Sequence, residues 1–85
     1  MKHVLSRHVE REMERRGIPL VLVQSVLEAP AQILPEHGDV MCYQSQVEIN
    51  GKRYLVRVMV NDEASPPKVV TAYRTSKIGR YRQTT

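Results

Sequence analysis

The chain has 85 residues, with 13 Lys and Arg against 9 Asp and Glu, and one cysteine. A chain this short folds as one domain with a small core, because it buries only a little more than about 60% of the surface exposed when unfolded. The single Cys42 excludes an internal disulfide, and no apolar run approaches the roughly 20 residues of a membrane span. Charges interrupt the first residues, so no signal peptide is recognised. We therefore expect a cytoplasmic protein without membrane association.

Basic residues are concentrated at the two ends of the sequence. Residues 2–17 carry five basic and three acidic side chains, residues 18–67 carry three basic and six acidic, and residues 68–85 carry five basic and none acidic. This asymmetry favours a polyanionic or acidic partner, although a solvated basic tail explains it equally well.

The first predicted helix runs from about Arg7 to Arg16, with Ser6 as its N-cap and Gly17 as its stop. Successive i+4 steps give it an apolar stripe and a second, polar line beside the stripe. The stripe consists of Leu5, Val9 and Met13, and the polar line of His8, Glu12 and Arg16. His8 is therefore expected at the edge of the buried face.

A second helix is predicted from Pro19 to Glu28, before Pro30. Its apolar residues cover so much of its surface that we expect the helix to be well buried: Ile18, Leu22 and Val26 on one face, widened by Leu20, Val21, Val23 and Leu27. The region from Pro30 to Gly38 is predicted as a loop, with a short extended piece at Gln32 to Leu34.

A β-hairpin is the strongest local prediction. Two strand-like runs, Met41 to Ile49 and Lys52 to Val60, flank Asn50-Gly51, a dipeptide that tolerates the positive φ angles of a tight two-residue turn. Pairing of Ile49 with Lys52 then fixes the register. It places one set of side chains on the core face, namely Met41, Tyr43, Ser45, Val47, Tyr54, Val56, Val58 and Val60. The other face, with Arg57 opposite Gln44 and Cys42 opposite Met59, is expected to be mixed and polar.

A last strand is predicted from Lys68 to Arg74, followed by a basic tail, residues 75–85. The whole chain, residues 1–85, then forms one α+β domain in which two N-terminal helices pack on one face of a three- to four-stranded antiparallel sheet. If Val70 and Ala72 face the helices, Thr71 and Tyr73 share the opposite face with Arg57. That opposite face is expected to be open to solvent or to a ligand.

The sequence gives little support for a metal, a cofactor or a covalent nucleophile. His3 and His8 are five residues apart instead of four, and no CxxC or HxxxH pair exists, so we expect neither a metal site nor a cofactor. Cys42 has no nearby base and is predicted to be a structural thiol.

Histidine together with cations matches the needs of metal-free RNA cleavage. In that reaction the ribose 2′-hydroxyl attacks the adjacent phosphate, so a base, an acid and a stabilising cation are required. His8 is the candidate acid or base, and its alternative role is that of an ordinary helix-surface histidine. Arg57 either binds phosphate or serves as a cross-strand partner of Gln44.

The C-terminal segment interleaves two aromatic residues with four cations: Tyr73, Arg74, Lys77, Arg80, Tyr81 and Arg82. Cations that hold phosphates and rings that stack on bases are typical of a nucleic-acid contact. Alternatively, the two tyrosines pack a core that has no Phe or Trp.

Three segments, Ser6-Arg7-His8, Arg16-Gly17-Ile18 and Val69 to Lys77, with Tyr81 close behind, resemble a family of small, largely uncharacterised bacterial proteins. That family is similar to the RelE-like toxins, within the barnase, EndoU and colicin nuclease group. The resemblance implies a RelE-like fold, RNA bound on the open sheet face and cleaved without metal, and a cognate antitoxin as protein partner. RelE-like folds place a strand before the helices, and only Lys2 to Leu5 can supply it here.

The resulting hypothesis is a cytoplasmic endoribonuclease toxin. The family-like positions are His8, Thr71, Tyr73, Thr75, Ser76, Lys77 and Tyr81, and Arg57 is added from the hairpin register. The catalytic candidates are His8, Arg57, Tyr73 and Lys77. The RNA-binding candidates are Arg11, Arg16, Thr71, Arg74, Thr75, Ser76, Arg80, Tyr81 and Arg82. The alternatives are a non-catalytic nucleic-acid or protein-binding module of the same fold, and an assembly role through an exposed strand edge; the protein is expected to be a monomer or a homodimer.

Overall fold

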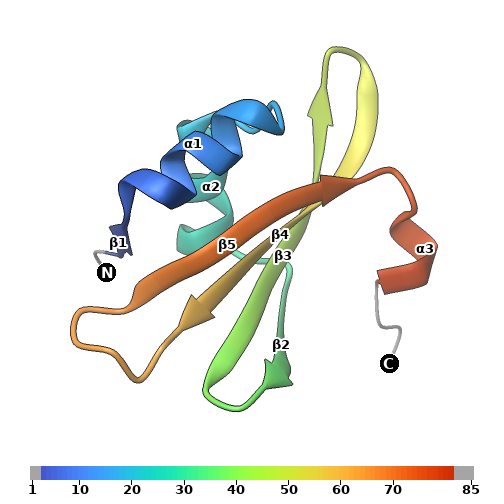
Figure 1. Ribbon diagram of the computed structural model, residues 1–85. Coiled ribbons are helices and arrows are strands. Elements are labelled where there is room, and N and C mark those ends of the chain that lie inside the picture. Colours follow the sequence, from blue (N-terminus) through green and yellow to red (C-terminus); the bar gives the residue numbers. More distant parts are fainter. Residues whose placement is uncertain (1–2, 82–85) are drawn as a thin grey trace.

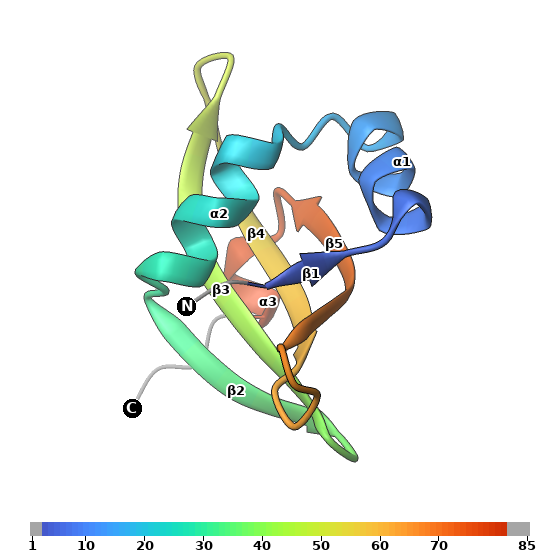
Figure 2. The ribbon, with the colours of Figure 1, turned by 90° about the vertical axis from the view of Figure 1, so that its left-hand side faces the viewer.

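A computed structural model describes residues 3–81 of the chain (Figure 1). Its elements, in chain order, are β1 (Val4–Leu5), α1 (Arg7–Arg15), α2 (Leu20–Glu28), β2 (Gln32–His37), β3 (Val40–Ile49), β4 (Lys52–Asn61), β5 (Lys68–Thr75) and α3 (Ile78–Tyr81). The strands form one sheet in the order β1-β5-β4-β3-β2. The helices α1 and α2 lie on one side of the sheet and α3 lies on the other (Figures 1 and 2). None of the helices within residues 3–81 is long and apolar enough to cross a membrane.

The predicted fold, two helices on a three- to four-stranded antiparallel sheet of RelE-like type, is wrong. The sheet has five strands and is mixed, because β1 pairs in parallel with the start of β5. A two-residue strand such as β1 leaves no periodic pattern in the sequence. The segment β2 contains Pro35, which indicated a loop but is compatible with an edge strand, where one side of the backbone is unpaired. The single turn α3 was included in the predicted tail.

The predicted hairpin is confirmed in full. Its ten residue pairs run from Ile49 opposite Lys52 to Val40 opposite Asn61. Asn50 and Gly51 have φ angles of 52° and 80°, so both turn residues adopt the positive φ that this tight turn requires. The register places Arg57 opposite Gln44, as the sequence predicted.

Both ends of α1 follow from local side-chain and backbone chemistry. The Ser6 hydroxyl accepts a hydrogen bond from the Val9 backbone N–H at 3.2 Å, which confirms the predicted N-cap. At the other end Gly17 has a φ of 68°, and the N–H groups of Gly17 and Ile18 donate to the carbonyls of Glu14 and Met13. This termination turns the chain directly toward α2.

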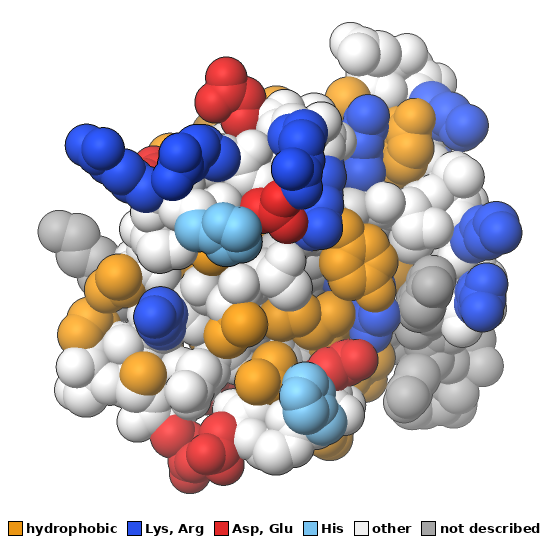
Figure 3. Space-filling model, viewed as in Figure 1, with side chains coloured by type: hydrophobic (Ala, Val, Ile, Leu, Met, Phe, Trp, Pro, Cys, Tyr) orange, Lys and Arg blue, Asp and Glu red, His pale blue; other side chains and the backbone are white. Residues whose placement is uncertain are grey.

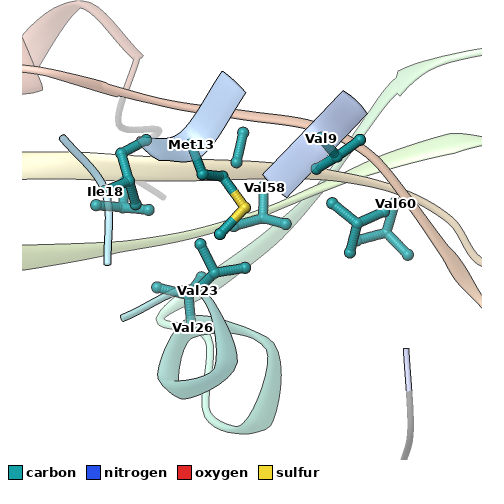
Figure 4. Close-up of a cluster of buried hydrophobic side chains, with 10 residues drawn as sticks. Val9, Met13, Ile18, Val23, Val26, Val58 and Val60 are labelled. Atoms are coloured by element: carbon teal, nitrogen blue, oxygen red, sulfur yellow. The ribbon is translucent and has the colours of Figure 1, made fainter. Parts of the chain in front are cut away.

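The core lies between the two long helices and the sheet. Figure 4 shows Val9 and Met13 from α1 and Val23 and Val26 from α2 gathered with Val58 of β4. The helix α1 packs on β5, whereas α2 packs on β3 and β4. Burial of each such apolar side chain contributes about 1.5–3 kcal/mol, which is the main stabilisation available to so small a domain.

Two predictions about the core are wrong. The N-terminal part of α2 is not buried, since the side chains of Leu20 and Val21 are 42% and 67% exposed. In β5, Ala72 is buried as predicted, but the other buried residue is Val69 and not Val70, which is exposed. A register irregularity in the β4–β5 pairing shifts the alternation of side chains at this point, which the sequence pattern does not reveal.

The sheet face away from α1 and α2 is not open, contrary to the prediction. Five of its side chains are buried: Cys42, Gln44, Leu55, Arg57 and Met59. The helix α3 lies on this side of the sheet (Figure 2). A ligand that bound this face would therefore have to contact side chains that are largely shielded from solvent.

Candidate nucleic-acid interface

The segments that carry the sequence resemblance meet where α1 crosses β5. The Arg16 guanidinium donates through Nη1 to the Ala72 carbonyl at 2.7 Å and to Thr71 Oγ1 at 3.3 Å. Its Nη2 pairs with Glu12 Oε1 at 3.0 Å, one helical turn back along α1. The Arg16 side chain is nevertheless 37% exposed, so it is fixed in orientation but remains accessible.

Arg74 lies beside this arginine on the same side of the sheet. It pairs with Val56, a core residue, and its side chain therefore projects toward the helices. The Arg74 guanidinium carbon lies 4.5 Å from the centre of the Tyr54 ring, a cation–π contact. Among residues 3–81 no carboxylate forms an ion pair with Arg74. The stacking on Tyr54 thus orients a cation without neutralising its charge.

Gly17 makes the close approach of Arg74 possible. A Cβ at position 17 would lie 3.1 Å from Nη2 of Arg74, closer than ordinary side-chain contacts. The left-handed φ at Gly17 also disfavours any residue with a side chain. The glycine therefore both ends α1 and leaves room for the guanidinium.

His8 lies in the first turn of α1 and is exposed. It precedes Glu12 and Arg16 at intervals of four residues, so the three side chains follow one line along the helix. The line spans about 12 Å between His8 and Arg16, from the rise of 1.5 Å per residue. Arg11, three residues after His8, is its neighbour on the helix surface. Arg11 also lines a shallow pocket with Arg7, Glu10 and Glu14 on the outer surface of α1. Together His8, Arg16 and Arg74 form what we call the α1–β5 face, over which Lys and Arg side chains gather in Figure 3.

Arg57 occupies a different environment on the opposite face of the sheet. Its neighbours in β4, Val56 and Val58, point into the core under the helices, so Arg57 points away from them. The Arg57 side chain is 8% exposed. Its guanidinium donates through Nε to Gln44 Oε1 at 2.9 Å and through Nη1 to the Tyr73 hydroxyl at 2.5 Å.

The network around Arg57 extends to the edge strand β2. Nη2 of Arg57 lies 3.5 Å from Glu36 Oε2, and Gln44 Nε2 donates to Gln32 Oε1 at 2.7 Å. Glu36 and Gln32 lie in β2, Gln44 in β3, Arg57 in β4 and Tyr73 in β5. Polar side chains therefore link these four strands to one another. We call this set, Gln32, Glu36, Gln44, Arg57 and Tyr73, the Arg57 network.

Burial and hydrogen bonding determine the charge states in and near the Arg57 network. Burial acts to lower the pKa of Arg57, but the Tyr73 hydroxyl and the neighbouring Cys42 and Glu36 act in the opposite direction, and the net pKa is raised. Burial raises the pKa of the Cys42 thiol, and the nearby guanidinium offsets only part of this effect. Arg57 thus remains charged, and Cys42 remains a protonated thiol with little nucleophilic character.

The structure does not bring the predicted catalytic residues together. Arg57 and Tyr73 are in contact, as the register predicted, but His8 lies on the other side of the sheet. Lys77 is exposed in the turn before α3, and its backbone N–H donates to Thr75 Oγ1 at 3.1 Å. His8, the pair of Arg57 and Tyr73, and Lys77 therefore occupy three separate places instead of one site.

The predicted RNA-binding residues are also divided. Arg16 and Arg74 lie on the α1–β5 face, where Thr71 supports Arg16 through its hydroxyl, whereas Arg11 lies on the outer surface of α1. Ser76, before α3, and Arg80, within α3, are exposed; Tyr81 ends that helix, and Arg82 lies outside the described residues. Within the described part of the chain no group of three or more His, Cys, Asp or Glu side chains is placed to hold a metal ion.

Sequence reasoning missed two residues that hold Arg74 in place on the α1–β5 face, Tyr54 and Gly17. Tyr54 was assigned only to the core face, and Gly17 only to the end of a helix. Their relation to Arg74 depends on the β4–β5 register, which includes the irregularity after Met59. No short-range signal in the sequence specifies that register.

The structure is thus a mixed sheet covered on one side by two helices, with accessible cationic side chains where α1 crosses β5. The family model described as a domain of unknown function (DUF4258) matches residues 5–74. The chain therefore belongs to this family, and the match includes α1 and nearly all of β5. Searches of curated proteins and of solved structures gave no match to the chain.

Proposed function

We propose that the protein binds RNA through the α1–β5 face and cleaves it without a metal ion. The observation that carries this proposal is the Arg74 guanidinium, which is held against Tyr54 and Gly17 beside Arg16 but is not neutralised by a carboxylate of the described residues. A cation that is oriented in advance loses little entropy when it binds a phosphate. Arg16 is also held in place, although it is paired with Glu12, and the planar guanidinium suits the bidentate geometry of phosphate recognition.

His8 provides the acid or base in this proposal. The attacking 2′-hydroxyl must lose a proton and the leaving oxygen must gain one, and imidazole performs both steps near neutral pH. Arg11, adjacent on the helix surface, would stabilise the charge that develops on the reacting phosphate. Because Arg16 lies about 12 Å further along the helix, Arg16 and Arg74 would hold a neighbouring phosphate and position the strand.

The biological role that we propose is that of a cytoplasmic toxin controlled by a cognate antitoxin protein. This part rests on the sequence resemblance of Ser6-Arg7-His8, Arg16-Gly17-Ile18 and the β5 segment to relatives of RelE-like toxins. The same face without catalysis would make a nucleic-acid-binding module. The exposed position of His8, with no hydrogen bond from another residue of the described chain to orient it, favours this second candidate.

Incubation of single-stranded RNA with the protein in excess EDTA tests the proposal. Cleavage should persist in the chelator, disappear in His8→Ala, and persist in the matched variant His37→Ala, whose histidine is exposed on β2. Cleavage by His8→Ala at the wild-type rate would refute the assignment of His8. Binding of RNA without any cleavage would refute the nuclease and support the non-catalytic binding module. Absence of RNA binding would refute both candidates.

A further inference from the structure

A groove separates α1 from the start of α2 on the flank of α1 that faces away from β5. It has a volume of about 380 Å³ and is lined by Glu10, Met13, Glu14, Gly17, Ile18, Pro19 and Leu20. The groove exists because α1 packs on β5 whereas α2 packs on β3 and β4, so the two helices diverge above the sheet (Figure 2). We call it the α1–α2 groove.

The floor of the α1–α2 groove is apolar. Met13 and Ile18 are buried at 2% exposure and form its base. Leu20, at 42% exposure, and Pro19 form one rim. An apolar floor of this kind, open to solvent on so small a domain, indicates an interaction surface.

The opposite rim is acidic. Glu10 and Glu14 are exposed and stand one helical turn apart along α1. Neither carboxylate forms an ion pair with a residue between 3 and 81. The third glutamate of the helix, Glu12, is different, because it pairs with Arg15 and Arg16 on the other flank. Arg7 and Arg11 lie beyond Glu10 and Glu14 on the outer surface of α1, so the acidic character is confined to the rim of the groove.

We propose that the α1–α2 groove binds an amphipathic helix of a partner protein, with an aliphatic side chain over Met13 and Leu20 and with Lys or Arg side chains at Glu10 and Glu14. An open groove with an apolar floor suits the apolar face of a helix, which places side chains at i, i+3 and i+4. Two unpaired carboxylates one turn apart fit two cations at the same spacing on the partner. This surface is distinct from the α1–β5 face, so the proposal holds whether or not the protein cleaves RNA.

Two synthetic amphipathic helices of equal length and identical leucine pattern, one with Lys and one with Glu on its polar face, provide the probes. The Lys peptide should bind and should shift the NMR amide signals of Met13, Ile18 and Leu20, whereas the Glu peptide should not bind. Removal of the rim charges in Glu10→Gln/Glu14→Gln should weaken binding by about tenfold, which corresponds to about 1.4 kcal/mol. The matched double variant Glu28→Gln/Glu48→Gln, at exposed glutamates elsewhere, should bind as the wild type does.

The apolar part of the groove is tested separately. Leu20→Ser should weaken binding of the Lys peptide, whereas Val70→Ser, at a similarly exposed valine on β5, should not. Equal binding of the two peptides, or equal loss in the groove and control variants, would overturn the proposal. So would a dimer in light scattering that Leu20→Ser converts to a monomer, because the groove would then hold a second copy of the chain.

Discussion

Arg57 and Arg74 project from neighbouring strands of the same sheet, yet their environments are opposite. Arg57 is 7% exposed, and its guanidinium contacts Gln44, Tyr73 and Glu36. Arg74 is only partly buried and rests on the ring of Tyr54, with no carboxylate of the described chain beside it. The two arginines therefore differ in how much of their hydrogen-bonding capacity is already used.

Because of this difference, we expect Arg57 to contribute to the stability of the fold and Arg74 to contribute to ligand binding. A guanidinium whose donors are occupied inside the protein stabilises the fold, because its loss leaves several polar groups without partners. A guanidinium that is oriented but not neutralised contributes little to the fold and is available to an anion. Arg57 thus ties β2, β3 and β5 to β4, and Arg74 serves the α1–β5 face.

The largest expected effect is on stability, from Arg57→Ala. Truncation removes the centre of the Arg57 network and leaves the buried Gln44 amide and the Tyr73 hydroxyl without this donor, so unfolding free energy should fall by about 3 kcal/mol. Urea denaturation followed by circular dichroism measures the change. Arg74→Ala is the matched control and should cost about 1 kcal/mol or less, the size of a cation–π contact. Equal losses in the two variants would remove the contrast between these arginines.

Gly17→Ala should affect both stability and binding. The left-handed backbone at this position costs about 1–2 kcal/mol with a side chain present, and the added Cβ displaces the Arg74 guanidinium. Urea denaturation gives the first effect and RNA binding the second. Gly38→Ala, which has a positive φ but no atom within 4 Å of its Cβ position, separates backbone strain from displacement of Arg74. It should lose stability without losing RNA affinity.

Tyr73→Phe should have a smaller effect, confined to the fold. The change removes the hydroxyl that accepts from Arg57 Nη1, at a cost of about 1 kcal/mol. RNA affinity should be unchanged, because Tyr73 belongs to the Arg57 network. A large loss of RNA affinity with normal stability would show that this tyrosine contacts the nucleic acid.

Cys42 gives the smallest expected effect, through the dependence of stability on pH. Its pKa is raised above the ordinary value of 9.0 by burial, so the folded state holds the proton more tightly than the unfolded state does. The contribution of Cys42 to the free energy of unfolding is complete below the pKa of the unfolded chain. It declines as the pH rises above that value, because the unfolded chain loses the thiol proton first. Chemical denaturation between about pH 8 and about pH 10 should show this decline, and Cys42→Ala should remove it. A decline of equal size in Cys42→Ala would assign it to another group.

The sequence predicted local structure well and the functional arrangement poorly. The Ser6 cap, the Gly17 stop and the Asn50-Gly51 hairpin depend on residues close together in the chain, and all are confirmed. The two-residue β1 and the proline-containing β2 lack a pattern of their own and form only because the rest of the sheet is present. This is why a mixed five-stranded sheet was not predicted.

The sequence also did not predict that His8 and Arg57 lie on opposite sides of the sheet, for a related reason. Alternation along β4 correctly placed Arg57 opposite the core face, but the sequence contains no signal for what covers that second face. Burial of Gln44 and Cys42 there makes the face part of the interior. The contact of Arg74 with Gly17 and Tyr54 joins three distant segments, and it became visible only in three dimensions.

RNA affinity of Arg74→Ala, measured by fluorescence anisotropy with a labelled single-stranded RNA over a series of salt concentrations, tests the central claim most directly. The α1–β5 face predicts that this variant binds about tenfold more weakly and that the salt dependence falls by about 0.7 in the slope of log K, one phosphate contact, while stability changes little. Arg57→Lys, in conditions where it is folded, should bind RNA as the wild type does. Unchanged RNA binding in Arg74→Ala together with lost binding in folded Arg57→Lys would contradict the account.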